Sequence, residues 1–235
     1  MSGSALLIHG LSSSPDGWWR VRGWLDGAGW RSNTVALLGH GGRGPAPSYE
    51  LEAYAADVRA AAPGPHDLVI AHSLGGSIAT VLAAADPAWT TRLVLLDPVW
   101  FIPADELPAT SAAQVAELGY TPETIALAKP HWDERDRAGK LAAAAAVQPD
   151  AVARTFGDPT RWDLRELART IAAPTLVLGG DPGVYTMLEP ADAYDVSQDA
   201  AHMQYVIVPG AGHSPHRDAP DATRAALLDW LNETA

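Results

Sequence analysis

The sequence predicts an open α/β fold, in which helices cover both faces of a mostly parallel sheet. Two observations indicate this class. Short apolar runs without polar alternation recur along the chain, a pattern typical of strands buried on both faces of a parallel sheet. Segments with helical spacing lie between these runs, and such alternation is typical of repeated strand-helix-strand units.

Six apolar runs bounded by turn residues are the expected strands: residues 5–9, 33–38, 67–72, 92–97, 174–180 and 204–210. The segments expected to form the helices of the core are residues 16–29, 50–62, 74–85 and 217–232. We expect these runs to form one mostly parallel sheet of six strands, with right-handed crossovers.

One interval breaks the alternation of strands and helices. Residues 98–173 separate two expected strands and contain no strand-like run, only helix-like pieces at 110–118, 122–128, 134–147 and 161–170. Since connections in compact domains are usually far shorter, we interpret this interval as an inserted helical cap. The expected organisation is therefore a core formed by residues 1–97 and 174–235, with the cap at 98–173.

Composition narrows the classes of partner. The chain has 235 residues, a formal net charge of −12 and no cysteine. A surface of this charge repels phosphate backbones, so nucleic-acid binding is not expected. The first residues lack both a basic segment and a long apolar stretch, so we expect no signal peptide and no membrane span, and a cytoplasmic location.

The stretch VIAHSLGGSIATVLAA, residues 69–84, places Ser73 between an expected strand and an expected helix. A serine in this position can simply cap the helix. Small residues two positions before and after it, Ala71 and Gly75, instead allow the strand and helix to approach closely in a strained turn that projects the hydroxyl outward.

The AHSLG pattern resembles the GxSxG nucleophile elbow of the α/β-hydrolase family. Its departure is Ala71 in place of the first glycine, a variant that some bacterial lipases of the family share. A serine needs a base and an acid that orients the base, and in this family they follow in the order Ser, Asp, His. His213, beyond the last expected strand, fits the base.

Two aspartates fit the acid, because each directly follows or ends an expected strand. Asp181 follows PTLVLGG and is the favoured choice; Asp97 ends RLVLLD and is the alternative that some relatives use. The resemblance also implies an oxyanion hole formed by the backbone N–H groups of Leu11 and Leu74. It implies no organic cofactor and no metal. Since the family's antiparallel first two strands are missing here, it also implies a sheet in the order 2-1-3-4-5-6, with the cap between strands 4 and 5.

Two other motifs match a binding-site pattern only in part, and we expect neither to form such a site. GHGGRG at residues 39–44 satisfies a dinucleotide-binding pattern, but Pro45 and Pro47 interrupt the helix that such a site needs. HSPH at residues 213–216 lacks the additional ligands of a zinc site. We expect His9 and His72 to be structural hydrogen-bonding residues.

The predicted function is a serine hydrolase that cleaves a small or medium carboxylic ester, lactone or thioester through an acyl-serine intermediate. Alternatives are a lyase or C–C bond hydrolase using the same triad, or a non-catalytic ligand receptor of this fold. The expected partner is a small-molecule substrate with an apolar group. Aromatic residues of the cap are candidates for lining its pocket: Trp100, Phe101, Trp132 and Trp162.

Overall fold

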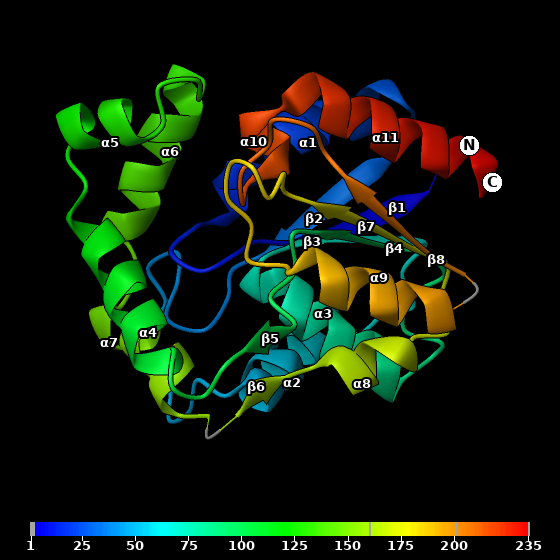
Figure 1. Ribbon diagram of the computed structural model, residues 1–235, viewed down its shortest axis with the longest axis horizontal. Coiled ribbons are helices and arrows are strands. Elements are labelled where there is room, and N and C mark those ends of the chain that lie inside the picture. The colour runs from blue at the N-terminus through cyan, green and yellow to red at the C-terminus, as the bar shows by residue number, and fades with distance from the viewer. Residues whose placement is uncertain (1–2, 160, 201, 235) are drawn as a thin grey trace.

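A six-stranded parallel sheet forms the centre of the computed structural model, which describes residues 3–159, 161–200 and 202–234 (Figure 1). Its order, β2-β1-β3-β4-β7-β8, is the predicted order, and every neighbouring pair is parallel. The strands are β1 (Ser4–Ile8), β2 (Arg31–Val35), β3 (Leu68–His72), β4 (Leu93–Leu96), β7 (Thr175–Gly179) and β8 (Met203–Ile207).

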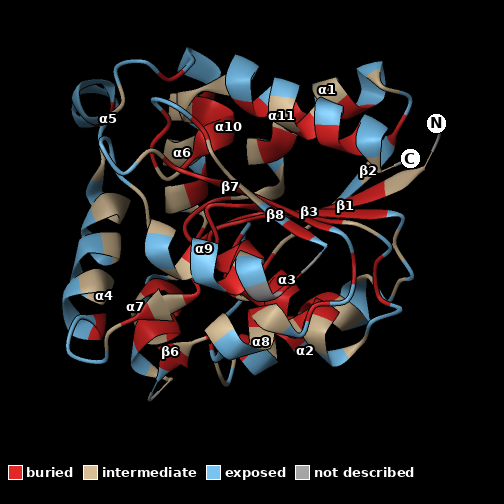
Figure 2. Cartoon of the chain, turned by 45° about the vertical axis from the view of Figure 1, so that its right-hand side comes forward, coloured by how far each residue is buried: buried red, intermediate tan, exposed pale blue. Residues whose placement is uncertain are grey.

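Helices cover both faces of the sheet because its inner strands, β1, β3, β4 and β7, are apolar on both faces. Alternate residues of β1 show this: Ala5 and Leu7 join one buried cluster, while Leu6 and Ile8 join the other. The first face packs against α1 (Trp19–Gly27), which follows the short helix η1 (Pro15–Trp18), and against α11 (Pro220–Glu233), which follows α10 (Pro215–Asp218). The second packs against α2 (Leu51–Ala61), α3 (Leu74–Ala85), α8 (Arg165–Arg169) and α9 (Pro190–Asp199). Figure 2 shows red, buried strands between helices that turn exposed faces outward.

The interval between β4 and β7 is helical, with one addition that the sequence did not indicate. It contains α4 (Leu107–Ala116), η2 (Glu117–Gly119), α5 (Pro122–Ala128), α6 (Glu134–Ala145) and α7 (Pro149–Gly157). Two strands of two residues each, β5 (Phe101–Ile102) and β6 (Trp162–Asp163), pair antiparallel at its two ends. Strands this short leave no recognisable pattern in a sequence.

Most of this interval lies beside the sheet rather than on its faces. Helices α4 to α7 stand to one side in Figure 1, whereas α8 lies under the sheet next to α3 and α9. Helix α8, near the end of the predicted cap segment, thus belongs to the helical layer of the core. None of the helices in the described part of the chain combines the length and apolar character that a membrane span needs.

Local sequence explains where the inserted helices begin. At α5, the Thr121 side chain accepts a hydrogen bond from the Thr124 amide, the Thr124 side chain accepts one from the Thr121 amide, and Pro122 occupies the first turn. At α6, the Asp133 side chain accepts from the Arg135 amide.

Helix α6 is tied to the core by a buried carboxylate. Asp136 accepts hydrogen bonds of 2.8 Å from Trp19 Nε1 and from the Arg20 guanidinium, both at the start of α1. Since a buried charge is stable only when paired, these bonds fix the side of α6 that faces α1.

Candidate active site

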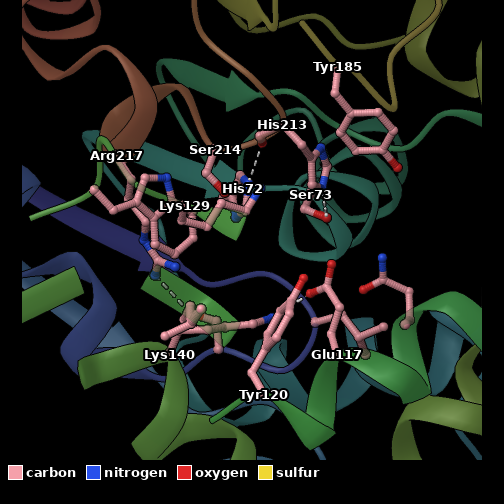
Figure 3. Close-up of a pocket in the computed structure, with 15 residues that line it drawn as sticks. His72, Ser73, Glu117, Tyr120, Lys129, Lys140, Tyr185, His213, Ser214 and Arg217 are labelled. Atoms are coloured by element: carbon pink, nitrogen blue, oxygen red, sulfur yellow. Dashed lines mark hydrogen bonds and ion pairs between the residues drawn. The ribbon is translucent and has the colours of Figure 1, made fainter. Parts of the chain in front are cut away.

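Ser73 occupies a strained turn between β3 and α3. Its φ of 55° and ψ of −121° lie in a region that residues with a Cβ rarely adopt, and its hydroxyl does not cap α3. The helix-cap interpretation of this serine is therefore wrong. The turn instead directs the hydroxyl toward His213 (Figure 3).

Two glycines make this turn possible by allowing close backbone contact. A Cβ on Gly75 would lie 2.4 Å from the carbonyl oxygen of Ile8 and 2.6 Å from that of His9, at the end of β1. A Cβ on Gly76 would lie 2.8 Å from the Cβ of Pro98, just beyond β4. Helix α3 can start against the sheet only because both positions lack a side chain.

His213 follows β8 and lies between a serine and an aspartate. Its Nε2 is 2.8 Å from Ser73 Oγ, and its Nδ1 is 2.5 Å from Asp97 Oδ2. Because a carboxylate only accepts, Nδ1 carries the proton, and Nε2 is left to accept from the serine hydroxyl. This is the arrangement in which a histidine can take a proton from serine.

Asp97 follows β4 and is fully buried. Besides His213, it accepts hydrogen bonds from the amides of Gly180 and Met187 and from the hydroxyl of Thr186, at distances of 2.5 to 2.9 Å. Four donors therefore hold the carboxylate in place beside the imidazole.

Asp181, which the sequence favoured as the acid, does not contact the imidazole. Its Oδ1 accepts from the Gly183 amide and its Oδ2 from the Gly210 amide, so that the side chain joins the loops after β7 and β8. The expected contact between Asp181 and His213 is therefore wrong. The carboxylate beside His213 belongs to Asp97, the alternative choice.

Three non-glycine residues have positive φ among those described: Ser12 at 48°, Ser73 at 55° and Asp97 at 43°. All three lie in the loops after β1, β3 and β4, which meet at the same edge of the sheet. Backbone strain of this kind persists only where surrounding contacts enforce it, and it gathers at functional sites.

The loop after β1, which contains the expected oxyanion donor Leu11, is held by two buried histidines. His9 Nε2 accepts from the Leu37 amide, and His40 Nε2 accepts from the Ser12 amide. The glycine-rich segment that carries His40 thus supports this loop. Leu11 and Leu74 line one small notch together with Ser73.

A third histidine fixes the position of His213. His72 Nε2 donates to the carbonyl oxygen of His213 at 2.8 Å, and the two rings lie 5.1 Å apart. Burial holds the pKa of His72 well below its usual value, and lowers the pKa of His9 to about 3 and that of His40 to about 4. These three histidines are neutral at pH 7, and His9 and His72 make the structural hydrogen bonds expected of them.

A cavity of about 60 Å³ opens in front of Ser73, between the sheet edge and helices α4 to α6. Of the four predicted aromatic lining residues, Trp132 lines this cavity, and Trp162 lines the apolar notch beside Ser73. Trp100 lines neither, since it is buried with its indole N–H bonded to Thr80 Oγ1. Phe101 also lines neither, and its ring lies 3.8 Å from the Arg165 guanidinium.

Several polar residues of the cavity were not singled out in the sequence. They include the cations Lys129, Lys140 and Arg217, together with Gln114, Glu117 and Tyr185. No sequence motif connects them, because residues 129, 140 and 217 come from distant segments. Among the residues that the structure describes, no group of three or more His, Asp or Glu side chains could hold a metal ion.

Comparisons with known proteins agree with this fold. The model of the alpha/beta hydrolase family matches residues 5–226, and the chain belongs to that family. It is 27% identical to an sn-1-specific diacylglycerol lipase of Mus musculus, over 96% of this chain and 80% of the lipase. It is 26% identical to the N-formylmaleamate deformylase of Pseudomonas putida, over 97% of this chain and 88% of the deformylase.

A solved structure shares the same fold. The crystal structure of E-2-(acetamidomethylene)succinate hydrolase superposes with a TM-score of 0.81 at 22% identity, covering 99% of this chain and 92% of that one. The family and these relatives support a hydrolase.

Proposed function

We propose that the chain is a serine hydrolase in which Ser73, His213 and Asp97 form the catalytic triad. The observation that carries this proposal is the continuous hydrogen-bonded chain from Ser73 Oγ through the imidazole to the buried Asp97, placed at a strained turn beside a cavity.

In the proposed reaction, Ser73 Oγ attacks the carbonyl carbon of the substrate while His213 Nε2 takes the hydroxyl proton. The tetrahedral intermediate places its negative oxygen against the amides of Leu11 and Leu74. Its collapse expels the leaving group, which takes the proton from His213. Water then attacks the acyl-serine, with His213 again as base, and releases the acid and free Ser73.

The notch and the cavity beside Ser73 suggest where the two parts of the substrate bind, the acyl group and the leaving group. The notch has a volume of about 10 Å³ and its lining is mostly apolar. Besides Ser73 and Gln114, it is lined by Leu11, Leu74, Val99, Phe156, Trp162 and Met187. We assign the acyl group to this notch, which has room for a methyl-sized group. The leaving group then occupies the larger, polar cavity. A carboxylic ester or amide of a very short acid is the substrate class that fits.

The names of two relatives are consistent with a short acyl group: one is a deformylase of N-formylmaleamate, and another hydrolyses an acetamidomethylene compound. A long-chain lipase substrate is a poorer fit to the notch, although the lipase relative covers most of this chain.

A fluorophosphonate probe and intact-mass measurement test the nucleophile. The expected result is one adduct on the unaltered protein, none on Ser73→Ala, and one on Ser197→Ala, a control serine on α9. Hydrolysis of 4-nitrophenyl esters should fall steeply from acetate to octanoate, and Ser73→Ala should abolish it. A folded protein that resists the probe and turns over no ester would instead be a ligand receptor.

A further inference from the structure

We infer that the substrate carries a carboxylate, or another anionic group, on its leaving-group side, and that Arg217 and Lys140 bind it. This inference rests on the proposed function, because it names the class of substrate for the same site. It starts from a contrast between the charge of the chain and the charge of the cavity.

The chain has a net charge of −12, yet its cavity is lined by three cations and one carboxylate. Lys129, Lys140 and Arg217 face a space in which Glu117 is the single acidic lining residue. Both lysines of the whole sequence therefore line this one cavity. Surface cations are usually scattered, and their concentration in a cleft of an acidic protein attracts anions to that cleft.

Arg217 is a buried cation that forms no salt bridge with any residue the structure describes. The residue is 6% exposed, and among the described residues no carboxylate oxygen lies within 4.0 Å of its guanidinium. Its one side-chain hydrogen bond is donated to Ser13 Oγ at 3.2 Å, while its Nε has no partner in the described part of the chain. A charge buried in this way is costly unless something pairs with it.

The nearest acids to Arg217 are already bonded elsewhere. Asp136 accepts from Trp19 and Arg20. Asp218 accepts from His131, Trp132 and the Ser214 amide. Their charges make it easier to bury this cation, but neither carboxylate accepts a hydrogen bond from its guanidinium among the described residues, so Arg217 retains N–H donors for an anion.

The remaining contacts of Arg217 orient it. Its guanidinium lies 5.0 Å from the centre of the Trp132 ring, a distance at which the ring attracts a cation. Because Trp132 also lines the cavity, this ring forms a wall along which the planar guanidinium can present N–H donors. Arginine in such a setting suits the bidentate binding of a carboxylate.

Lys140 supplies the second positive charge. Its ammonium donates to Ser12 Oγ at 2.7 Å and to Glu117 Oε2 at 2.9 Å, which leaves one N–H donor for a ligand. Ser12 follows Leu11 in the loop of the proposed oxyanion hole. An anionic group bound between Lys140 and Arg217 would therefore lie within one small cavity with the acyl-accepting Ser73.

The test compares two small substrates that differ in charge. Acetoxyacetate and acetoxyacetamide carry the same acetyl group, and hydrolysis of either releases one proton at pH 7 that a pH-stat records. We expect kcat/KM for the anion to exceed that for the amide by at least about 10-fold, the worth of a hydrogen bond to a charged group. A ratio of one or less, with both substrates turned over, would overturn the inference.

Four variants locate the site, and each is judged by the ratio of the two kcat/KM values within that variant, because this ratio cancels losses common to both substrates. Arg217→Gln should bring the ratio close to one. Glu117→Gln should raise it, because it frees Lys140 and removes the negative charge. Arg224→Gln, exposed on α11, should leave it unchanged. A preference that survives Arg217→Gln and Lys140→Gln alike would place the anion elsewhere and overturn the inference.

Two further measurements keep the outcome decisive. If circular dichroism shows that Arg217→Gln does not fold, the test rests on two other ratios. The unaltered protein should prefer the anion by at least about 10-fold, and Glu117→Gln should raise this preference. If neither ester is turned over, the proposed function fails, and titration calorimetry with glycolate and glycolamide decides the anion site separately. Binding of glycolate but not glycolamide would support it, and binding of neither would overturn it.

Discussion

Asp97 Oδ2 and His213 Nδ1 lie 2.5 Å apart, although 116 residues separate them in the sequence. The contact joins the loop after β4 to the loop after β8, two strands that are not neighbours in the sheet. Strand β7 lies between them, and its own aspartate, Asp181, binds backbone amides instead. The contact predicts that Asp97, and not Asp181, acts as the acid of the triad.

Asp97→Asn should reduce kcat by about 10⁴-fold, because an amide that donates to Nδ1 favours the wrong imidazole tautomer. The matched control is Asp181→Asn, which alters an exposed turn and should leave kcat near its original value. Steady-state kinetics with 4-nitrophenyl acetate measures both. Loss of activity in Asp181→Asn together with full activity in Asp97→Asn would refute the assignment of the triad acid.

Gly75→Ala should destabilise the protein by about 3 kcal/mol, since its Cβ would meet two backbone oxygens that cannot move independently. Gly139→Ala is a useful counterpart in α6. A Cβ there meets nothing within 4 Å, and alanine favours a helix, so it should stabilise by up to about 1 kcal/mol. Urea denaturation compares the two, and equal effects would contradict the steric argument.

Trp100→Phe and Trp132→Ala should separate stability from substrate binding. Loss of the Trp100 indole removes the hydrogen bond that Thr80 Oγ1 accepts in the core, although this hydroxyl still donates to the Gly76 carbonyl. We expect a cost of about 1 kcal/mol in the free energy of unfolding, with KM unchanged. Trp132→Ala removes a wall of the cavity and should raise KM for acetoxyacetate. An increase in KM for the Trp100 variant would show that this residue reaches the substrate.

Stability should fall on acidification from pH 7 to pH 5. His9 is buried with a pKa of about 3, whereas the unfolded chain takes up this proton near pH 6.5. The unfolded state therefore binds more protons between those values, and the neutral histidine's contribution is lost as the pH falls. At pH 5 the loss is about 2 kcal/mol for this one residue.

The histidines His40, His72 and His216, whose pKa values are also lowered by burial, add to this loss. The relevant measurement is chemical denaturation at several pH values above 5, where carboxylates with lowered pKa values remain ionised. A free energy of unfolding that is flat over this range would mean that these histidines are not buried as described.

Much of the fold could be predicted because burial leaves a direct pattern in sequence. All six strands overlap the apolar runs, and their order is the one that the family resemblance implied. Helix α7 was missed because its pattern merged with the apolar segment before it, and β5 and β6 were too short to leave a pattern.

The choice between Asp97 and Asp181 lay beyond the sequence for a different reason. Both residues lie at the carboxyl ends of adjacent strands, so strand position does not distinguish them. The difference lies in backbone conformation: Asp97 has a φ of 43° and meets donors from the loop at residues 180–187, while the turn after Gly180 folds Asp181 onto Gly183 and Gly210. Such loop geometry depends on tertiary contacts that a linear pattern does not contain.

The cationic cavity could not be predicted from the sequence either. Lys129 and Lys140 belong to the inserted segment and Arg217 to α10, and only the folded chain brings them to one cavity. Lys129 and Lys140 line the cavity and are the only lysines of the chain. Every ε-amino group of the protein is thus located in one place. Amine-directed chemical footprinting, read by mass spectrometry at these two side chains, would report on occupancy of the cavity with almost no background from the rest of the surface.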